Sequence, residues 1–231
     1  MEEKLLQSHL MTKKLQLKLH HRCSMIRKEN VRMLDRNKRR HPLETFLSNI
    51  DQDNSKQSPE VSVGIQLGYD YVNLRGDPSN SDFVSAAENA LNQSIPLAPN
   101  TISEDKHIVY WLGPDEWLVT GKGNFRETLS MHLKDHHASI NSQTGGLVQL
   151  NITGKKTRQL IAKGSTLDLH PRVFLTGHCA QSGFAKASIL IALNNDDPLF
   201  TLIVRRSYAE YVALWLKKSG EEFFINFSVH N

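Results

Sequence analysis

The sequence predicts an α+β fold built from two units that share the order strand, helix, hairpin, helix, with mostly antiparallel sheets covered by helices on one face. Apolar residues alternate along residues 68–74 and 147–152, as they do in strands. Apolar residues at helical spacing follow each stretch, and two extended segments joined by a turn come next. The second set begins about 80 residues after the first. The repeat is predicted from this shared order of elements and not from residue identity.

The first unit opens with the strand at residues 68–74. It ends at Gly76-Asp77-Pro78, because glycine frees φ and proline fixes it in turns. A helix capped by Ser81 is expected next. Its inner face follows the i, i+3, i+4 rule and holds Phe83, Ala86, Ala87, Ala90 and Leu91.

A hairpin and a second helix complete the first unit. Residues 108–112 and 117–120 flank Gly113-Pro114-Asp115-Glu116, which has the turn chemistry of a β-hairpin. The helix is expected to start at Asn124, with Glu127 reaching back to complete a capping box. Its inward residues are expected to be Phe125, Leu129 and Leu133.

The second unit begins with the strand at residues 147–152, which Gly154 ends. A short helix at residues 155–163 is expected to bury Leu160 and Ile161. Gly164 is placed to terminate that helix in the left-handed region. A connector then leads to the second hairpin.

The second hairpin and the last helix have clear boundaries in the sequence. Residues 187–193 and 199–205 flank five residues, 194–198, that favour a turn. Ser207 and Glu210 are spaced as a capping box, and Gly220 ends the helix. Its apolar stripe is expected to consist of Tyr208, Tyr211, Val212, Trp215 and Leu216.

Composition excludes several classes of protein. With 231 residues and 39% hydrophobic content the chain can bury a core, and no stretch reaches the roughly 20 apolar residues of a membrane span. The acidic opening at residues 1–4 has no apolar signal region behind it, so we expect a cytoplasmic protein. Cys23 and Cys179 are the two cysteines, too few for a disulfide framework.

The positive net charge comes from residues 1–41, which hold twelve Lys or Arg against four Asp or Glu, whereas the remaining residues hold sixteen against twenty. This segment is expected to be a basic, disordered extension. Met25 or Met33 would then be an alternative start. Binding to nucleic acid by counterion release is a weaker alternative, because residues 1–40 contain no aromatic side chain to stack on bases.

His170, His178 and Cys179 could ligate a metal, but their spacing is unlike that of zinc sites and no fourth ligand is evident. We therefore expect Asp168 to cap a turn and Cys179 to pack as a small hydrophobe.

Three histidines, His132, His136 and His137, lie near the end of the second predicted helix. His132 and His136 are four residues apart, as in some metal sites. Stabilisation of a helix C-terminus by cationic histidine is the preferred interpretation.

Nucleophilic catalysis and nucleotide binding have no sequence support. There is no Gly-x-Ser-x-Gly elbow, and Gly145-Gly146 precedes a strand instead of opening a helix where a phosphate could sit.

Several separated motifs carry a family resemblance over roughly residues 42–218. They are Leu-Asp-Leu-His-Pro-Arg-Val-Phe at 167–174, Gly-His-Cys-Ala-Gln at 177–181, Val-Arg-Arg-Ser-Tyr-Ala-Glu-Tyr at 204–211, Trp-Leu at 215–216, Trp-Leu-Gly-Pro-Asp-Glu-Trp-Leu at 111–118 and Asn-Leu-Arg-Gly-Asp-Pro at 73–78. Together they resemble the gamma subunit of heterotetrameric sarcosine oxidase. That family is similar to the folate-binding domain of aminomethyltransferases.

The resemblance implies a non-catalytic gamma-type subunit that assembles and stabilises a multi-subunit sarcosine oxidase. Such a complex oxidises sarcosine to glycine and transfers the one-carbon unit to tetrahydrofolate or releases formaldehyde. Its large and small subunits would be the partners. FAD, FMN, NAD and tetrahydrofolate are expected on those partners, and no cofactor, metal or catalytic residue is expected in this chain.

The alternative is a stand-alone folate-binding or aminomethyl-transfer protein of the same fold. Aminomethyltransferases place an acidic residue where Ile140-Asn141-Ser142 stands here, and an amide cannot act as a general base. Arg205-Arg206 is interpreted as a surface or interface pair and not as a clamp for the folate carboxylate.

The expected organisation is a basic extension at 1–41, a linker and entry segment at 42–60, the α+β domain at 61–220 with halves at about 61–138 and 139–220, and an apolar tail at 221–231. The tail concentrates phenylalanine in residues 223–227, and it is either a final strand or a docking peptide.

Overall fold

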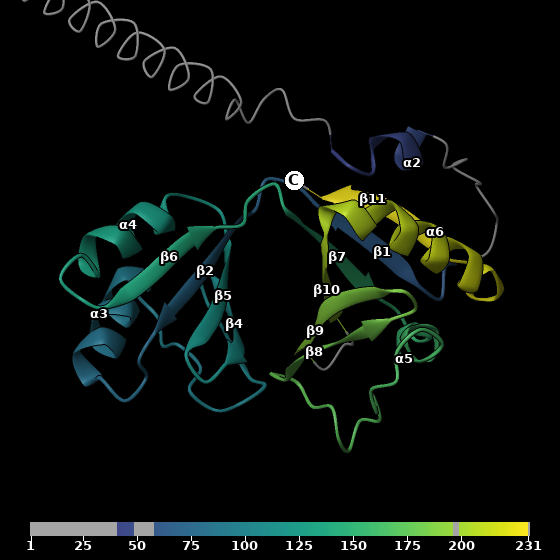
Figure 1. The fold of residues 1–231 in the computed structure, drawn as a ribbon. Coiled ribbons are helices and arrows are strands. Elements are labelled where there is room, and N and C mark those ends of the chain that lie inside the picture. The colour runs from purple at the N-terminus through teal and green to yellow at the C-terminus, as the bar shows by residue number, and fades with distance from the viewer. Residues whose placement is uncertain (1–40, 49–57, 196–198, 231) are drawn as a thin grey trace, which may run out of the picture. The chain divides into compact units, whose positions relative to one another are not determined.

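Two β-sheets, each with helices on one of its faces, make up the fold in a computed structural model that describes residues 41–48, 58–195 and 199–230 (Figure 1). Residues 42–231 form a unit separate from residues 1–41. Residues 1–40 of the basic extension with the alternative starts, residues 49–57 of the linker and three residues of the second hairpin turn lie outside the described ranges.

The first sheet has the strand order β3-β4-β5-β2-β6. Its strands are β2 (Asp70–Gly76), β3 (Ile102–Glu104), β4 (Ile108–Gly113), β5 (Glu116–Gly121) and β6 (Ala138–Ser142). Two helices pack on it, α3 (Ser81–Leu91) and α4 (Phe125–His132).

The second sheet has the strand order β11-β1-β7-β10-β9-β8. Its strands are β1 (Ser62–Gln66), β7 (Leu147–Thr153), β8 (Cys179–Phe184), β9 (Ala187–Asn195), β10 (Leu199–Arg205) and β11 (Asn226–His230). Its helices are α2 (Glu44–Ser48), α5 (Thr157–Ala162) and α6 (Ala209–Ser219), with short 3₁₀ turns η2 (Arg206–Tyr208) and η3 (Glu221–Phe223) on either side of α6.

The predicted α+β class with mostly antiparallel sheets is confirmed. Among the described strands, only β1 and β11 pair in parallel. The two hairpins, β4–β5 and β9–β10, lie where the turn chemistry placed them. The apolar tail supplies β11, so the final-strand alternative is the one observed.

Strand alternation sends every second side chain toward the helices and the others toward the opposite sheet. On β5, Trp117 and Val119 pack with α3 and α4, whereas Leu118 faces the second sheet. On β10, Leu202 faces α6 and Ile203 faces the first sheet. The result is a helix–sheet–sheet–helix arrangement with a separate apolar cluster between the sheets, made of Tyr71, Tyr110, Leu118, Cys179, Leu190, Ala192 and Ile203.

The two sheets differ from the predicted halves in which strands they contain. β1 precedes the first sheet in the chain but pairs with β7 and β11 of the second sheet. β3, β6 and β8 were not predicted. They are edge strands with mostly half-buried or exposed residues, so their sequences lack the alternation of a half-buried strand.

The predicted helix caps were partly wrong. Asn80, not Ser81, caps α3, because its side-chain oxygen accepts from the backbone N–H groups of Asp82 and Phe83. The capping box at Asn124 does not form. The box at Ser207 does not form either, because a 3₁₀ turn occupies residues 206–208 and α6 begins at Ala209.

Gly164 does not adopt the left-handed conformation. Its need for glycine is steric, since a Cβ there would lie 2.8 Å from the rings of both Phe184 and Trp215. Within the predicted stripe of α6, Val212 and Leu216 are buried, but Tyr208 is 43% exposed. At Gly164, packing against Phe184 and Trp215, and not a left-handed cap, therefore requires glycine.

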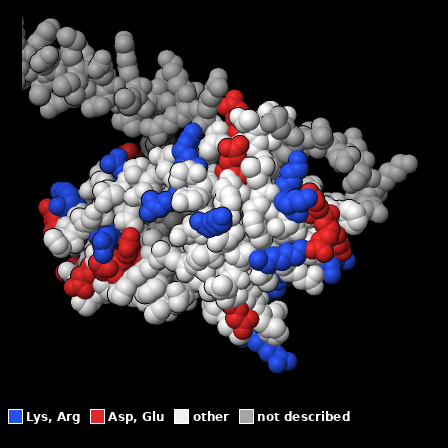
Figure 2. All heavy atoms as spheres, turned by 45° about the vertical axis from the view of Figure 1, so that its right-hand side comes forward, with Lys and Arg blue, Asp and Glu red and all other residues white. Residues whose placement is uncertain are grey.

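Basic side chains do not form a continuous stripe on the face of the molecule in Figure 2, where Lys and Arg alternate with acidic and uncharged surface. This face does not favour nucleic-acid binding, which usually needs a continuous basic footprint. That alternative was predicted for residues 1–41, of which 1–40 lie outside the described residues.

His107 is a buried, neutral histidine that should make the fold sensitive to acid. Its side chain is 4% exposed, its Nδ1 has no partner, and the ring contacts Phe125 at a centroid distance of 4.7 Å. Burial, followed by the nearby Lys106, lowers the pKa of His107, and Asp105 opposes this only in part.

Because the folded-state pKa of His107 lies below the unfolded value of about 6.5, the unfolded chain binds the proton more readily, and stability present above that pH is lost as the pH falls. We expect His107→Leu to lose less stability than wild type between pH 7 and pH 5 in urea titrations. The exposed His137, changed to Gln, is the control and should keep the wild-type slope. If the free energy of unfolding fell equally with pH in all three proteins, His107 would not be the source of the acid sensitivity.

Candidate functional site

A pocket of about 540 Å³ lies between the two sheets, a volume in the range of small-molecule sites. Its polar lining residues are Asn73, Glu116, Gln143, Gln181, Ser182, Ser188 and Arg205. Its apolar lining residues are Leu112, Leu118, Leu147, Ile189, Leu190 and Ile203.

Polar side chains reach this pocket because each strand sends its alternate residues away from the helices. Asn73 follows the buried Val72 on β2 and points to the inter-sheet side, where its Nδ2 donates to Glu116 Oε1 at 2.7 Å. On the opposite sheet, Gln181 Nε2 donates to the carbonyl of Leu112 at 2.9 Å. This hydrogen bond ties β8 to β4 at the edge of the pocket.

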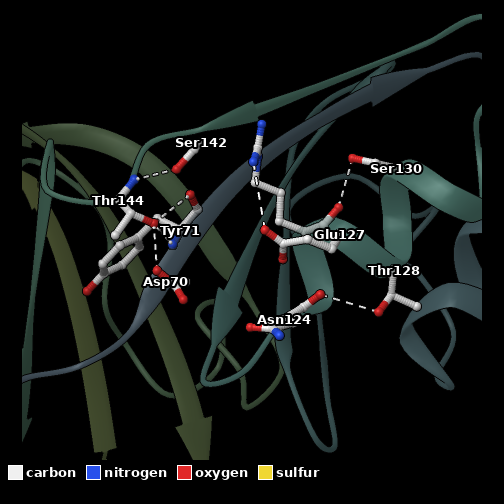
Figure 3. A network of polar contacts seen from close by, with 9 residues as sticks. Asp70, Tyr71, Asn124, Glu127, Thr128, Ser130, Ser142 and Thr144 are labelled. Carbon is white, nitrogen blue, oxygen red and sulfur yellow. Dashed lines mark hydrogen bonds and ion pairs between the residues drawn. The ribbon is translucent and has the colours of Figure 1, made fainter. Parts of the chain in front are cut away.

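The crossover from the first sheet to the second runs through residues 143–146 and is fixed by a polar network (Figure 3). Thr144 Oγ1 donates to Asp70 Oδ1 at 3.0 Å and accepts from the backbone N–H of Tyr71 at 3.0 Å. The backbone N–H of Gln143 donates to the carbonyl of Tyr71 at 2.8 Å. Gln143 is thereby held where its side chain lines the pocket.

The network should contribute measurably to stability. Thr144→Val keeps the shape of the side chain but removes the acceptor of the Tyr71 N–H and the donor to Asp70. We expect a loss of about 1–3 kcal/mol, because the buried Asp70 and Tyr71 each lose one hydrogen bond.

Thr128→Val is the matched control for this substitution. Thr128 is half-buried on α4, and its hydroxyl donates to the backbone carbonyl of Asn124 (Figure 3). Urea unfolding of both variants should show a change within about 0.5 kcal/mol for this control. A Thr144 variant as stable as the control would show that the crossover does not depend on the network.

Arg205 lies at the rim of the pocket and is exposed. It also lines a second, open hollow of about 490 Å³, together with Pro42, Gly146, Arg206, Ser207 and Glu210. The adjacent Arg206 is fixed through its backbone, which donates to the carbonyl of Gly146 at 2.8 Å. Of the pair, Arg205 alone lines the inter-sheet pocket and is exposed, whereas Arg206 is half-buried and lines only the second hollow.

The polar groups that line the pocket can form hydrogen bonds. Glu116 is the one carboxylate among the lining residues, and it is already bonded to Asn73. The other polar groups are amides, hydroxyls and the Arg205 guanidinium. Amides and hydroxyls at this site can bind and orient a polar molecule, but they are not general acids or bases at neutral pH.

Cys179 packs as a small hydrophobe, as expected. It is 1% exposed within the inter-sheet cluster, and its thiol contacts the carbonyls of Thr101 and Trp111 at 3.4 and 3.5 Å. Burial raises the pKa of the Cys179 thiol to about 12, against the opposing effect of a backbone hydrogen bond with Trp111. A thiol with this pKa is not a nucleophile at neutral pH.

Two of the histidine candidates take part in hydrogen bonds of the described connector between α5 and β8. His170 and His178 each accept a backbone N–H through Nδ1, from Arg172 at 3.2 Å and Leu175 at 3.4 Å. Asp168 caps the turn as expected, accepting from the N–H of His170 at 2.9 Å. Across 41–48, 58–195 and 199–230, no group of three or more potential ligands is placed to hold a metal ion.

The helical pairing of His132 and His136 was wrong, because α4 ends at His132 and His136 lies in the following turn. Asn141 lies on the edge strand β6, where its Nδ2 donates to Ser139 Oγ, and it is not among the residues that line the pocket.

The pocket residues themselves were not predicted from the sequence. They come from strands β2, β4, β5, β7, β8, β9 and β10 and from the crossover, so no local motif joins them. The sequence signal that could have indicated the pocket was a polar residue at alternate positions of a strand, such as Asn73. This signal is ambiguous, because such residues normally face solvent in a two-layer protein.

Sequence comparison matches residues 75–222 to the model of the sarcosine oxidase, gamma subunit family. A relative named sarcosine oxidase subunit gamma, from Corynebacterium sp. (strain U-96), is 26% identical over 71% of this chain and 78% of its own length. A second protein of that name, from Corynebacterium sp. (strain P-1), is 24% identical over 80% of this chain and 91% of its own length.

Two solved structures share the fold. A chain of heterotetrameric sarcosine oxidase from Corynebacterium sp. U-96 aligns with a TM-score of 0.73 at 22% identity, covering 80% of this chain and 96% of that chain. The glycine cleavage system aminomethyltransferase T from Bartonella henselae aligns with a TM-score of 0.54 at 14% identity, covering 73% of this chain and 48% of that chain. Among the described residues, no helix is both long and apolar enough to span a membrane.

Proposed function

The chain belongs to the sarcosine oxidase gamma subunit family, and we propose that it is a gamma-type subunit of a multi-subunit sarcosine oxidase, acting in assembly and stabilisation. The observation that carries the proposal is the family match over residues 75–222, which spans both sheets from β2 to α6. The complex oxidises sarcosine to glycine, and its one-carbon unit passes to tetrahydrofolate or leaves as formaldehyde.

The absence of an active site from this chain is part of the proposal. Its support is chemical, since the pocket carboxylate Glu116 is bonded to Asn73 and the Cys179 thiol is buried with a raised pKa. FAD, FMN, NAD and tetrahydrofolate belong to the large and small subunits in this proposal. The complex is cytoplasmic.

Co-expression with the other subunits tests the proposal. A tagged version of this chain should purify with the large and small subunits in a fixed ratio. Expressed alone, it should be colourless and should not turn over sarcosine. Failure to co-purify with those subunits, or sarcosine oxidation by the isolated chain, would contradict the proposed role.

A second candidate, folate binding by the chain alone, is favoured by one observation, the polar inter-sheet pocket. Its amides and the Arg205 rim could bind a polar ring and a carboxylate. Calorimetry of the isolated chain with tetrahydrofolate tests this candidate. Tight binding that Arg205→Gln weakens would establish it, and absence of heat at millimolar ligand would exclude it.

A further inference from the structure

Side chains of opposite charge reach the inter-sheet pocket from the two sheets. On β5, Glu116 lies two residues before Leu118, which belongs to the apolar cluster between the sheets, so strand alternation sends both side chains to the same side. On β10, Arg205 lies two residues after Ile203 of that cluster and shares its side in the same way. Glu116 and Arg205 both line the pocket, and Figure 1 shows β5 and β10 in different sheets.

Neither charge is neutralised within the described part of the chain. Glu116 accepts through Oε1 from the amide of Asn73 at 2.7 Å, and this amide is a neutral donor. Among the described residues, Glu116 Oε2 and the Arg205 guanidinium have no hydrogen-bond or ion-pair partner. Arg75 differs, because it lies opposite Glu116 in the β2–β5 pairing and its guanidinium is paired with Asp115 at 3.0 Å. The pocket therefore presents one carboxylate and one guanidinium to a ligand.

The same pocket has an apolar wall. Leu118, Leu190 and Ile203 line it and are only 4%, 7% and 3% exposed. Gln143 and Ser188 also line the pocket, and their side chains can both donate and accept hydrogen bonds. A matching ligand combines an apolar group with two groups of opposite charge, because each part then meets a complementary surface.

We propose that the inter-sheet pocket binds a zwitterionic amino acid with an apolar side chain. The ammonium group of the ligand donates to Glu116 Oε2, and its carboxylate accepts from the planar guanidinium of Arg205. The ligand's side chain packs on Leu118 and Ile203. Asn73 is a positioning residue, because its hydrogen bond to Oε1 orients the Glu116 carboxylate. This inference goes beyond the assembly role and does not rest on it.

The two fixed charges make the pocket selective for a ligand that carries both charges. A ligand with only one of them displaces water from Glu116 or Arg205 without replacing its hydrogen bonds, and a desolvated charge without a partner is costly. The apolar wall adds a second preference. Glycine leaves this wall uncovered in a pocket of about 540 Å³, so we expect leucine to bind more tightly than glycine.

Calorimetry of the wild-type, full-length chain with L-leucine and two analogues tests the proposal. Isopentylamine keeps the ammonium group and the branched side chain but lacks the carboxylate, whereas isocaproate keeps the carboxylate and lacks the ammonium group. We expect each analogue to bind at least about tenfold more weakly than leucine, because one charge-assisted hydrogen bond is lost. Isocaproate or isopentylamine binding as tightly as leucine would overturn the proposal, and so would the absence of heat with millimolar leucine.

Two variants that each remove one charge locate the ligand. Glu116→Gln and Arg205→Gln should each weaken leucine binding at least about tenfold. The matched controls are Arg126→Gln and Glu127→Gln, which make the same changes in an exposed pair on α4 and should bind leucine like wild type. If the two pocket variants keep the wild-type affinity, leucine does not bind between Glu116 and Arg205 and the proposal is wrong.

The analogue series requires only the wild-type chain, so it decides the question if a variant does not fold. Heat with tetrahydrofolate but none with leucine would overturn the proposal in favour of the folate candidate. Co-purification with the large and small subunits is a separate measurement. A chain that binds leucine without co-purifying keeps this site and loses the assembly role, and the opposite result keeps the assembly role and loses this site.

Discussion

Replacing Trp117 by alanine is expected to destabilise the protein by about 3–5 kcal/mol, as for large-to-small changes of a buried aromatic. Trp117 is 0% exposed and is the largest of the fully buried side chains described. Its indole Nε1 donates to the carbonyl of Pro96 at 2.7 Å, and its ring lies 5.9 Å from that of Phe83 on α3. The substitution opens a cavity between β5 and α3 and also leaves a buried carbonyl without its donor.

Urea unfolding followed by far-UV circular dichroism measures this loss without relying on tryptophan fluorescence. Trp111→Ala is the matched control, since Trp111 lies directly opposite Trp117 in the β4–β5 hairpin but is only half-buried. We expect a clearly smaller loss for the control. If the two variants lose the same stability, the ring of Trp117 does not fill the first core as the structure indicates.

Trp117→Phe separates the two contributions. It retains much of the aromatic packing and removes the hydrogen bond to Pro96, so its loss should lie between those of wild type and Trp117→Ala. The hydrogen bond from Trp117 to Pro96 also attaches the segment between α3 and β3 to the sheet. The side chain of Trp117 therefore affects both the β4–β5 hairpin and this segment.

The elements that could be predicted from the sequence are those whose signals are local. The hairpin around Pro114 and the one across residues 194–198 each combine alternation with turn residues, and both formed where expected. β1 was not predicted because its partners, β7 and β11, lie far along the chain. The residues of β7 and β11 that pair with β1 lie about 90 and 160 residues later in the chain, so no local pattern identifies this strand.

Predicted caps failed where tertiary packing outweighed local hydrogen bonding. Ser207 and Glu210 have capping-box spacing, yet a 3₁₀ turn precedes α6 and places Ala209, a fully buried residue, at the helix start. Gly164 was interpreted as a left-handed terminator, but contact with Phe184 and Trp215 is what excludes a side chain there. In both cases the deciding atoms belong to elements distant in sequence.

In the candidate site, too, the features with local sequence signals could be predicted and those that depend on tertiary contacts could not. Cys179 could be assigned to the core from its apolar context, and Asp168 to a turn cap from its spacing to His170. The pocket could not be predicted, because strand alternation alone does not distinguish a face that meets solvent from one that meets a second sheet. Asn73 faces a pocket only because β8, β9 and β10 lie opposite it.

Replacing Gly154 by alanine should be the most damaging single-methyl change in the described chain. Gly154 has φ of +114°, and an added Cβ would lie 2.2 Å from the carbonyl oxygen of Glu60 and 3.1 Å from Cα of Val61. Those atoms are backbone at the entrance to β1, so no side chain can rotate away. Strained φ and overpacking each cost about 1–3 kcal/mol, which gives an expected loss of about 2–6 kcal/mol.

Gly123→Ala separates the two causes, because Gly123 has a similar φ of +101° but nothing within 4 Å of an added Cβ. Its loss should reflect backbone strain alone, about 1–3 kcal/mol. The difference between the two variants in urea unfolding then measures the clash with Glu60. Since Lys156 N–H also donates to the Glu60 carbonyl at 3.3 Å, moving that carbonyl would disturb the start of α5. Equal losses at the two glycines would mean that β1 can shift freely against the β7–α5 turn, contrary to the close approach of Gly154 to Glu60.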